Sequence, residues 1–304
     1  MSLIALLGAL ESGLIYALMA FGVLISFRIL DFPDLTADGS FPLGGAVAGV
    51  SIIAGFNPWV ACIFGMMAGM MAGIVTAWLH VKLGILHLLA GILVMTSLWS
   101  INLRIMDAPN LSLLGQPTVF ASFGDVGLWG KVLILFGVVV LVKLLLDWFF
   151  STQIGLAMRA TGSNQKMAQA QGINTSLMIV LGMAISNGLI ALAGALFVQT
   201  QGFSDVSIGI GAIVIGLVAV IMGEAVITTR RVIFMTLAVV IGAVLYRLFL
   251  QVALSSDLLR EIGFKSQDLN LVTAVLVVIL LVISNQKGKW LGKRKAKLIG
   301  ETRS

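Results

Sequence analysis

The chain has 304 residues, of which 59% are apolar and 11% are charged, and its mean hydropathy is +1.09. Soluble domains carry about 25% charged residues, so this composition excludes a soluble globular protein. The formal net charge of +6 does not indicate nucleic-acid binding, because seven of the nineteen basic residues lie in the last eighteen positions. The single cysteine, Cys62, excludes an internal disulfide, and two scattered histidines give little support to a metal site.

Nine apolar stretches approach the roughly 20 residues that a membrane-spanning helix needs. In chain order they are residues 10–30, 42–57, 58–79, 84–103, 129–150, 175–200, 207–227, 231–253 and 269–285. The second is short, and the chain after Asp31 could re-enter the membrane, so eight or ten spans also fit. We predict an all-α polytopic membrane protein with about nine (8–10) transmembrane helices, comprising a transmembrane domain at 1–285 and a basic tail at 286–304.

The distribution of Lys and Arg predicts the orientation, because these residues concentrate on the cytoplasmic side. If the tail is cytoplasmic, alternation of the spans puts fourteen basic residues inside and five outside. The turn-rich loop 104–128 and the mixed-charge loop 254–268 are then external. The run 1–9 extends the first helix or lies along the interface, and we expect that helix to be retained because no basic segment precedes it.

A polar segment at 151–174 separates two spans on the predicted cytoplasmic side. Ser163 or Asn164 is a suitable N-cap for a short helix that stops at Gly172. Helical spacing would place Met167, Ala168 and Gln171 on one side of it. Such a helix could insert into a groove of a soluble partner, and an ordinary connector explains the same pattern equally well.

Three stretches resemble a known family. The pattern Gly155-Leu-Ala-Met-Arg-Ala-Thr-Gly-Ser-Asn, followed by Met167-Ala-Gln-Ala-Gln-Gly-Ile-Asn, is similar to the cytoplasmic coupling loop of the branched-chain amino-acid and simple-sugar permease superfamily of ABC importers. Residues 182–196 resemble the glycine- and alanine-rich helix after that loop. Residues 30–45 resemble a signature of one subgroup, encoded with lipoprotein or periplasmic binding proteins and in some cases assigned to tryptophan or tyrosine uptake. The resemblance covers nearly the whole chain in order.

The resemblance implies an assembly in the bacterial cytoplasmic (inner) membrane. Two permease copies, a homodimer, would form the pore, two separate ABC ATPase subunits would dock on the coupling helices, and a periplasmic or lipoprotein solute-binding protein would deliver the solute. ATP and Mg²⁺ would bind to the ATPase subunits, and this chain would carry no cofactor. The absence of a Gly-x-x-x-x-Gly-Lys-Ser/Thr loop from the sequence agrees with that division. The ATPase-coupling residues would be Arg159, Asn164, Met167, Ala168, Gln171 and Gly172.

Two short motifs suggest an inverted repeat. Phe32-Pro-Asp-Leu-Thr and Phe203-Ser-Asp-Val-Ser each follow an apolar run that contains Gly-Leu-Ile and precede a glycine-rich run. The predicted topology puts the first motif near the inner face and the second near the outer face, as an inverted repeat requires. Five identities and a spacing that differs by four residues are also compatible with chance.

Ionisable residues inside a membrane are costly and are therefore candidates for function. Asp34 and Asp38 are four residues apart, which on a helix would place both carboxylates on one face near a solute ammonium group. The alternative is capping, with Asp38 or Ser40 at the start of a helix from Phe41. Lys143 and Asp147 are interpreted as a local pair. The candidate translocation path comprises Glu11, Asp34, Thr36, Asp38, Asn187 and Asp205.

Aromatic residues offer a weaker indication of the path. Tyr16, Phe21, Phe27, Phe32 and Trp99 could line it, although aromatic residues at helix ends are more often interface anchors.

The sequence and the resemblance together predict the permease subunit of a binding-protein-dependent ABC importer for a small solute, an amino acid or similar. An ion-coupled secondary transporter is the alternative, in which buried carboxylates would bind H⁺ or Na⁺. An integral membrane enzyme would need a convergent set of acid, base or nucleophile, for which the residues give little support.

Overall fold

The computed structural model describes residues 3–124, 127–227, 229 and 231–255. Seven helical segments in this part of the chain are long and apolar enough to cross a membrane. They include α1 continued by the π-helix η1, and α9 preceded by the short 3₁₀-helix η3. In chain order the membrane helices and their extensions are α1 (Leu3–Val23), η1 (Leu24–Ile29), α2 (Ala37–Ile53), α3 (Pro58–Leu83), α4 (His87–Met106), α5 (Gly127–Ser151), α8 (Thr175–Gln201), η3 (Val206–Gly209), α9 (Ala212–Val226) and α10 (Val232–Ser255).

Eight of the nine predicted apolar segments are helices in the described residues. The second, α2, is too short to count as a span and begins at Ala37, five residues before the predicted start. Pro42 lies inside it, one turn from its N-terminus. The extension of the first helix through residues 3–9 is confirmed. The ninth segment 269–285, the tail 286–304 and most of the loop 254–268 lie outside the described residues, so a total of nine stays a prediction.

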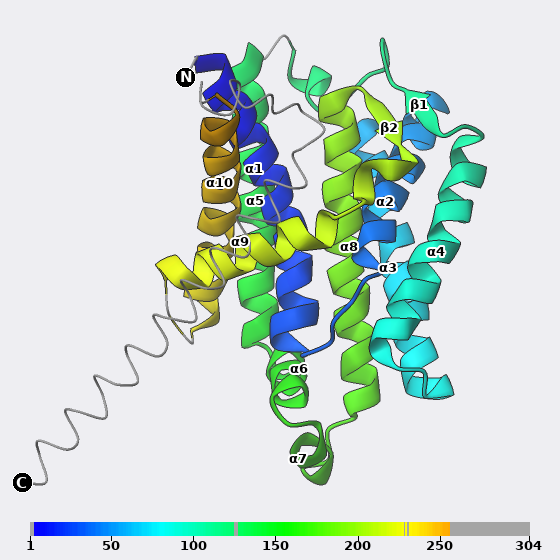
Figure 1. The fold of residues 1–304 in the computed structure, drawn as a ribbon, viewed down its shortest axis with the longest axis vertical. Helices are drawn as coiled ribbons and strands as arrows, with labels where there is room; N and C mark the ends of the chain where they lie inside the picture. Colours follow the sequence, from blue (N-terminus) through cyan, green and yellow to red (C-terminus); the bar gives the residue numbers. More distant parts are fainter. Residues whose placement is uncertain (1–2, 125–126, 228, 230, 256–304) are drawn as a thin grey trace, which may run out of the picture.

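The two ends of the bundle carry different structures (Figure 1). At one end, β1 (Asn110–Ser112) pairs antiparallel with β2 (Phe203–Asp205), with Leu111 opposite Ser204. The loop that contains β1 also holds the 3₁₀-helix η2 (Ala121–Phe123). At the other end, α6 (Gln153–Ser163) and α7 (Gln165–Ala170) project beyond the long helices. The prediction of an all-α chain is therefore wrong in one detail, since a two-stranded ribbon joins the loop after α4 to the end of α8.

Small residues allow α8 to lie close to its neighbours at the core of the bundle. A Cβ on Gly73 of α3 would lie 2.2 Å from the carbonyl oxygen of Met183, and one on Gly69 would lie 2.4 Å from that of Asn187. On another face of α8, a Cβ on Gly194 would lie 1.9 Å from the carbonyl oxygen of Phe41 in α2. Backbones can approach this closely only where side chains are absent, so α2 and α3 are fixed against α8.

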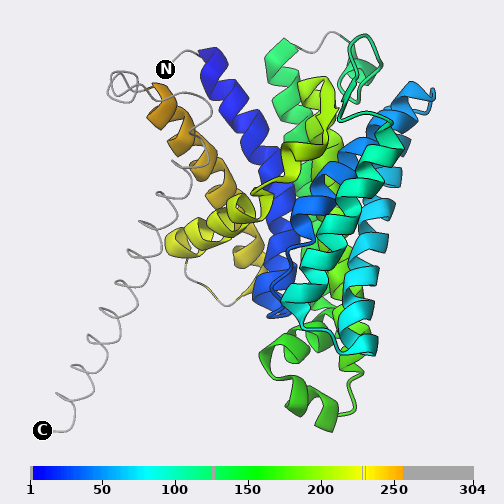
Figure 2. The ribbon, with the colours of Figure 1, turned by 45° about the vertical axis from the view of Figure 1, so that its right-hand side comes forward.

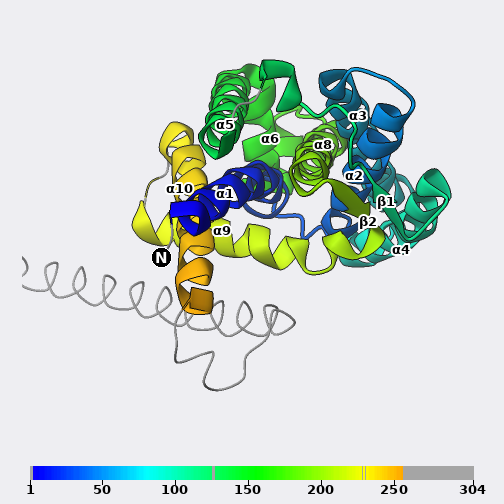
Figure 3. The same cartoon turned by 90° about the horizontal axis from the view of Figure 1, so that it is seen from above.

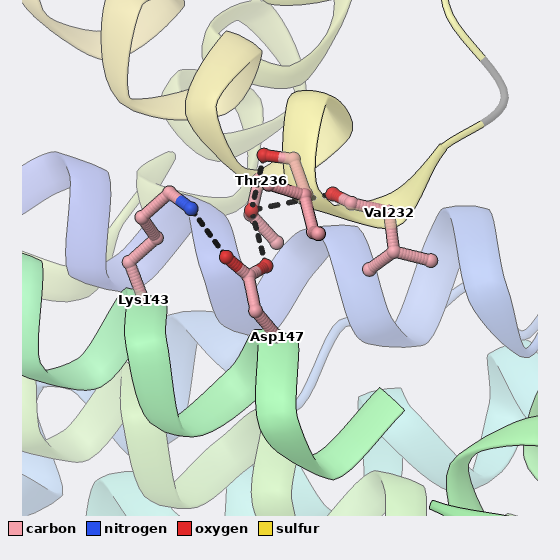
Figure 4. A network of polar contacts seen from close by, with 5 residues as sticks. Lys143, Asp147, Val232 and Thr236 are labelled. Carbon is pink, nitrogen blue, oxygen red and sulfur yellow. Dashed lines mark hydrogen bonds and ion pairs between the residues drawn. The ribbon is translucent and has the colours of Figure 1, made fainter. Parts of the chain in front are cut away.

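The second half of the chain packs on α1. Helix α9 runs across the bundle and contacts α1, α2 and α10 (Figures 2 and 3). Lys143 and Asp147 of α5 form the predicted ion pair. The pair is more than local, because Thr236 of α10 donates a hydrogen bond to Asp147 Oδ1 at 2.7 Å and so ties α10 to α5 (Figure 4).

Candidate functional site

The linker between η1 and α2, residues 30–36, carries the first group of candidate residues back into the bundle. From the end of η1 the chain climbs to the start of α2, which lies part-way between the two ends (Figure 1). Asp31 begins this return with φ of 52°, a conformation that few residues other than glycine adopt. Phe32 and Asp34 are buried, at 4% and 1% exposed. A charged side chain is therefore placed inside the helix bundle by a non-helical segment.

Asp34 is held by two hydrogen bonds from neutral donors. Its Oδ1 accepts from the backbone N–H of Thr36 at 2.9 Å, and its Oδ2 accepts from Asn187 Nδ2 of α8 at 2.7 Å. The other end of the Asn187 amide is also used, because Oδ1 accepts from the hydroxyl of Ser40 at 2.7 Å. The Asn187 side chain therefore bridges the linker and α2 from within α8.

A third helix joins this network through hydroxyl groups. Thr36 Oγ1 and Thr76 Oγ1 of α3 are 2.8 Å apart, and Thr76 also donates to the carbonyl oxygen of Ala72 at 3.1 Å. Thr36, Ser40, Thr76 and Asn187 are all completely buried. Among the described residues, Asp34 has no ion-pair partner. We refer to Asp34, Thr36, Ser40, Thr76 and Asn187 as the Asp34 network.

Asp38 binds the start of another helix, unlike Asp34. Its Oδ1 accepts from the backbone N–H of Ile213 at 2.8 Å, and its Oδ2 accepts from that of Gly211 at 3.1 Å. These groups are at the N-terminus of α9, whose own N-cap, Gly211, has no side chain to satisfy them. Asp38 therefore caps a helix more than 170 residues away in sequence and adds a negative charge where the helix dipole favours it.

The backbone of Asp38 also contacts the second half of the chain. Because Pro42 has no N–H, the Asp38 carbonyl lacks its usual helical partner four residues on. A Cβ on Gly209 would lie 1.9 Å from that carbonyl oxygen, so only glycine can lie here. The starts of α2 and α9 meet at this point inside the bundle.

Several predictions about the candidate path need correction. Asp34 and Asp38 do not share a helix face, because α2 begins after Asp34. Asp38 and Ser40 do not cap a helix from Phe41; they lie in the first turn of α2 and point to α9 and to Asn187.

The remaining two acidic candidates lie apart from the Asp34 network. Asp205 lies in the β-ribbon, where its Oδ1 accepts from the backbone N–H of Ser207 at 2.6 Å. Glu11 lies in the N-terminal half of α1, near Lys131 of α5. The structure therefore joins Asp34, Thr36 and Asn187, places Asp38 beside them, and leaves Glu11 and Asp205 elsewhere.

The polar segment 151–174 folds as two short helices. Asn164 is the N-cap of α7, its Oδ1 accepting from the N–H of Met167 at 3.0 Å, and Gly172 follows α7 with φ of 83°. Both features were predicted. The predicted face is divided, however, because Met167 is 62% exposed whereas Ala168 is buried. Gln171 and Gly172 are exposed, so the surface of α7 offers Met167 and Gln171 without Ala168.

Helix α6 connects this projecting surface to the linker. A Cβ on Gly162 would lie 1.8 Å from the carbonyl oxygen of Ile29, the last residue of η1. Met158 is fully buried between α6 and α8, where a Cβ on Gly182 would meet both its sulfur and the side chain of Leu30. Arg159 borders a cavity of about 340 Å³ that Arg28 also lines. Helix α6 therefore packs directly on the end of η1, where the linker that holds Asp34 begins.

The structure brings the two histidines together, although they were predicted to be scattered. The rings of His80 and His87 lie 5.2 Å and 5.4 Å from the ring of Phe32, centroid to centroid, and 5.9 Å from each other. His80 Nδ1 is 2.8 Å from the carbonyl oxygen of Ile85. No group of three residues that could hold a metal ion occurs in the described part of the chain. The two histidines therefore pack against Phe32, two residues before Asp34 in the linker.

Comparisons with known proteins agree with this architecture. The family described as branched-chain amino acid transport system, permease component, matches residues 5–284. A tyrosine transport system permease protein of Clostridioides difficile is 38% identical over 294 residues, which are 97% of this chain and 96% of that protein. An autoinducer 2 import system permease protein of Salmonella paratyphi B is 30% identical over 189 residues, 59% of this chain and 51% of that protein.

A solved structure supports the fold independently. It is described as a metal-chelate type ABC transporter in an inward-facing conformation, and it matches with a TM-score of 0.51 at 17% identity. The match covers 94% of this chain and 85% of that one. At this identity the likeness concerns the fold alone. Because the family match extends over nearly the whole chain, the protein belongs to the permease components of the branched-chain amino acid transport system family of ABC transporters.

Proposed function

We propose that the chain is the membrane-spanning permease subunit of a binding-protein-dependent ABC importer, which translocates a small solute such as an amino acid. ATP would be hydrolysed by separate ATPase subunits, two per assembly, and a periplasmic or lipoprotein solute-binding protein would deliver the solute. The observation that carries the proposal is a continuous series of packing contacts. These contacts lead from the exposed surface of α7, through Gly162 of α6, to the linker that holds Asp34. They would connect an ATPase-docking surface to the buried Asp34 network.

The orientation and division of the chain follow from this proposal. Helices α6 and α7 would face the cytoplasm of a bacterium, and the β-ribbon would face the binding protein outside the inner membrane. The permease domain would comprise residues 1–285, the tail 286–304 would be cytoplasmic, and a second copy would complete the pore. Arg159, Asn164, Met167, Gln171 and Gly172 would form the ATPase-coupling surface, with Ala168 supporting it from the buried side.

An inverted repeat that relates α1–α3 to α8–α10 is supported by local chemistry and by packing. In the paired motifs, Asp34 accepts from the N–H of Thr36 and Asp205 accepts from that of Ser207, each two residues on. Helices α2 and α3 pack on α8, while α9 and α10 pack on α1. If Phe32 corresponds to Phe203, then Asp38 corresponds to Gly209, and these two residues are in contact. An inverted repeat places the solute path at the interface between its halves.

The coupling role can be tested by one exposed residue and a matched control. We expect Met167→Glu to abolish co-purification of the ATPase subunit, because a charge replaces an exposed apolar contact on α7. Leu114→Glu makes the same change at the opposite end, where Leu114 is 85% exposed, and should retain the ATPase. Retention of the ATPase by Met167→Glu, with normal membrane insertion, would contradict the assignment.

The ion-coupled alternative is favoured by one feature, the buried Asp34 without an ion-pair partner among the described residues. Uptake in vesicles separates the two mechanisms. An ATP-driven importer should keep its uptake when an ionophore collapses the ion gradients at constant ATP, whereas an ion-coupled transporter should lose it.

A further inference from the structure

A cavity of about 440 Å³ opens where α2, α4 and the segment that precedes α9 meet. Its volume falls within the roughly 300–1,000 Å³ of small-molecule sites. The side chains around it are largely apolar, with a few polar groups among them. They are Asp38, Gly39, Pro42, Met95, Thr96, Trp99, Asn102, Val206 and Ile210.

Asn102 supplies an unused hydrogen-bond acceptor to this cavity. The side chain is completely buried, and its Nδ2 donates to the carbonyl oxygen of Gly39 at 3.4 Å. Its Oδ1 has no hydrogen-bond partner among the described residues. A buried acceptor without a donor is destabilising by about 1–3 kcal/mol, so such atoms are rare in native structures. A hydrocarbon chain from lipid could not supply the missing donor.

Asp38 supplies the negative charge. Each of its carboxylate oxygens accepts one backbone N–H from the start of α9, and each has a second lone pair left. Among the described residues it forms no ion pair. Asp38 and Asn102 both line the cavity, so its wall carries a negative charge and an unused acceptor, which together suit a cation with several N–H donors.

The α4 side of the cavity, which also carries Asn102, suits an apolar or aromatic group. Trp99 and Met95 lie one turn apart on α4, and Trp99 is 44% exposed. The hydroxyl of Thr96 is occupied within its own helix, because it donates to the carbonyl oxygens of Ile92 and Leu93 at 3.0 Å and 2.9 Å. This wall therefore offers an indole ring, a thioether and methyl groups.

We propose that this cavity is a solute site in the translocation path, which holds an ammonium group between Asp38 and Asn102 and an apolar or aromatic body against Met95 and Trp99. The class of ligand is a small organic ammonium ion with an apolar group, such as an apolar or aromatic amino acid. The inference names the solute class of the proposed importer and rests on that function.

Protection of an introduced cysteine tests the site in the purified permease. Thr96→Cys places a thiol in the cavity, whereas Ser97→Cys places one beside it on another face of α4, and the native Cys62 is buried. The probes are L-tyrosine, L-leucine, tyramine and 4-hydroxyphenylpropionate, the last of which lacks an ammonium group. We expect at least one of the ammonium probes to slow maleimide labelling of Thr96→Cys at least three-fold, with no effect on Ser97→Cys.

Two outcomes of this labelling would overturn the proposal. One is equal protection by 4-hydroxyphenylpropionate and the ammonium probes, and the other is no protection by any ammonium probe. Adding Asn102→Leu to Thr96→Cys should remove the protection, since the unused acceptor is then absent. Protection that persists in the double variant would exclude Asn102 from the site.

Uptake by the assembled importer separates this site from the proposed function. We expect Trp99→Leu to reduce ATP-driven uptake of the protecting probe at least ten-fold, and Trp78→Leu, which alters a similarly exposed indole on α3, to leave it unchanged. Normal uptake with Trp99→Leu and Asn102→Leu would overturn the site while the importer stands. Protection without ATP-driven uptake by the unaltered protein would refute the importer and support the site.

Discussion

Asp34 and Asp147 are both carboxylates enclosed by the helix bundle, and they differ in how their charge is balanced. Asp147 pairs with Lys143 on the same helix and accepts a hydrogen bond from Thr236 (Figure 4). Asp34 is bound only by the N–H of Thr36 and by the Asn187 amide, which are neutral donors. A buried ion pair is explained by structure, whereas an unbalanced buried charge is costly and calls for a function.

The largest expected effect is from Asn187→Leu. This change removes the donor to Asp34 Oδ2 and the acceptor for Ser40 at once, and it leaves a buried charge with one hydrogen bond. Leaving a buried polar group without its partner costs about 1–3 kcal/mol, and more for a charged group, so with two groups affected we expect a destabilisation of about 3 kcal/mol or more. Thermal unfolding of the purified permease in detergent measures it as a lower Tm.

A double variant shows whether the loss comes from Asp34. Asp34→Leu combined with Asn187→Leu removes the charge together with its donor, so it should unfold at a higher temperature than Asn187→Leu alone. If the effects of Asp34→Leu and Asn187→Leu on the free energy of unfolding simply added, the buried charge would not be the cause of the loss.

Lys143→Met tests the balanced carboxylate. Asp147 keeps its bond from Thr236 and loses its cation, and the two charged side chains are only 16% and 11% exposed. We expect a loss of about 2 kcal/mol, between the values for surface and buried pairs, with solute uptake unchanged. Asp147→Asn in the same background should recover part of the loss. A large defect in uptake by stable Lys143→Met protein would give this pair a functional role.

Asp34→Asn tests the unbalanced carboxylate with little change in shape. The amide oxygen can still accept from Thr36, and the new NH2 group can donate to Asn187 once the Asn187 amide turns over and donates to Ser40, so the protein should remain folded. We expect uptake to fall at least ten-fold, about 1.4 kcal/mol in the barrier, because the charge is lost. The matched variant Asp147→Asn should retain uptake. Unchanged uptake by Asp34→Asn would remove Asp34 from the path.

The sequence was sufficient for features that depend on local chemistry. Apolar runs predicted the positions of the described helices to within several residues, and Asn164 and Gly172 predicted where α7 begins and ends. The coupling role of segment 151–174 was predicted from its similarity to a family and stays a prediction.

What the sequence could not predict are contacts between distant segments. The bond from Asn187 to Asp34 spans 153 residues, and that from Ile213 to Asp38 spans 175. Capping by Asp38 was predicted for a helix from Phe41, which is wrong; Asp38 caps α9 instead, because tertiary packing brings the N–H groups of Gly211 and Ile213 within 3.1 Å of its carboxylate. Burial of Ala168 likewise depends on the tertiary packing around α7, which helical spacing does not describe.

The smallest expected effect is from Thr236→Val, which refines the description of the balanced cluster. Thr236 Oγ1 is 2.7 Å from Asp147 Oδ1, and it also lies within 3.2 Å of the carbonyl oxygens of Val232 and Ile233. Valine keeps the shape and removes one hydrogen bond between α10 and α5, so we expect a loss of about 1 kcal/mol in unfolding free energy. In the Lys143→Met background the same change should cost more, because Asp147 then has no other partner among the described residues. An equal loss in both backgrounds would mean that Thr236 stabilises its own helix rather than the charge of Asp147.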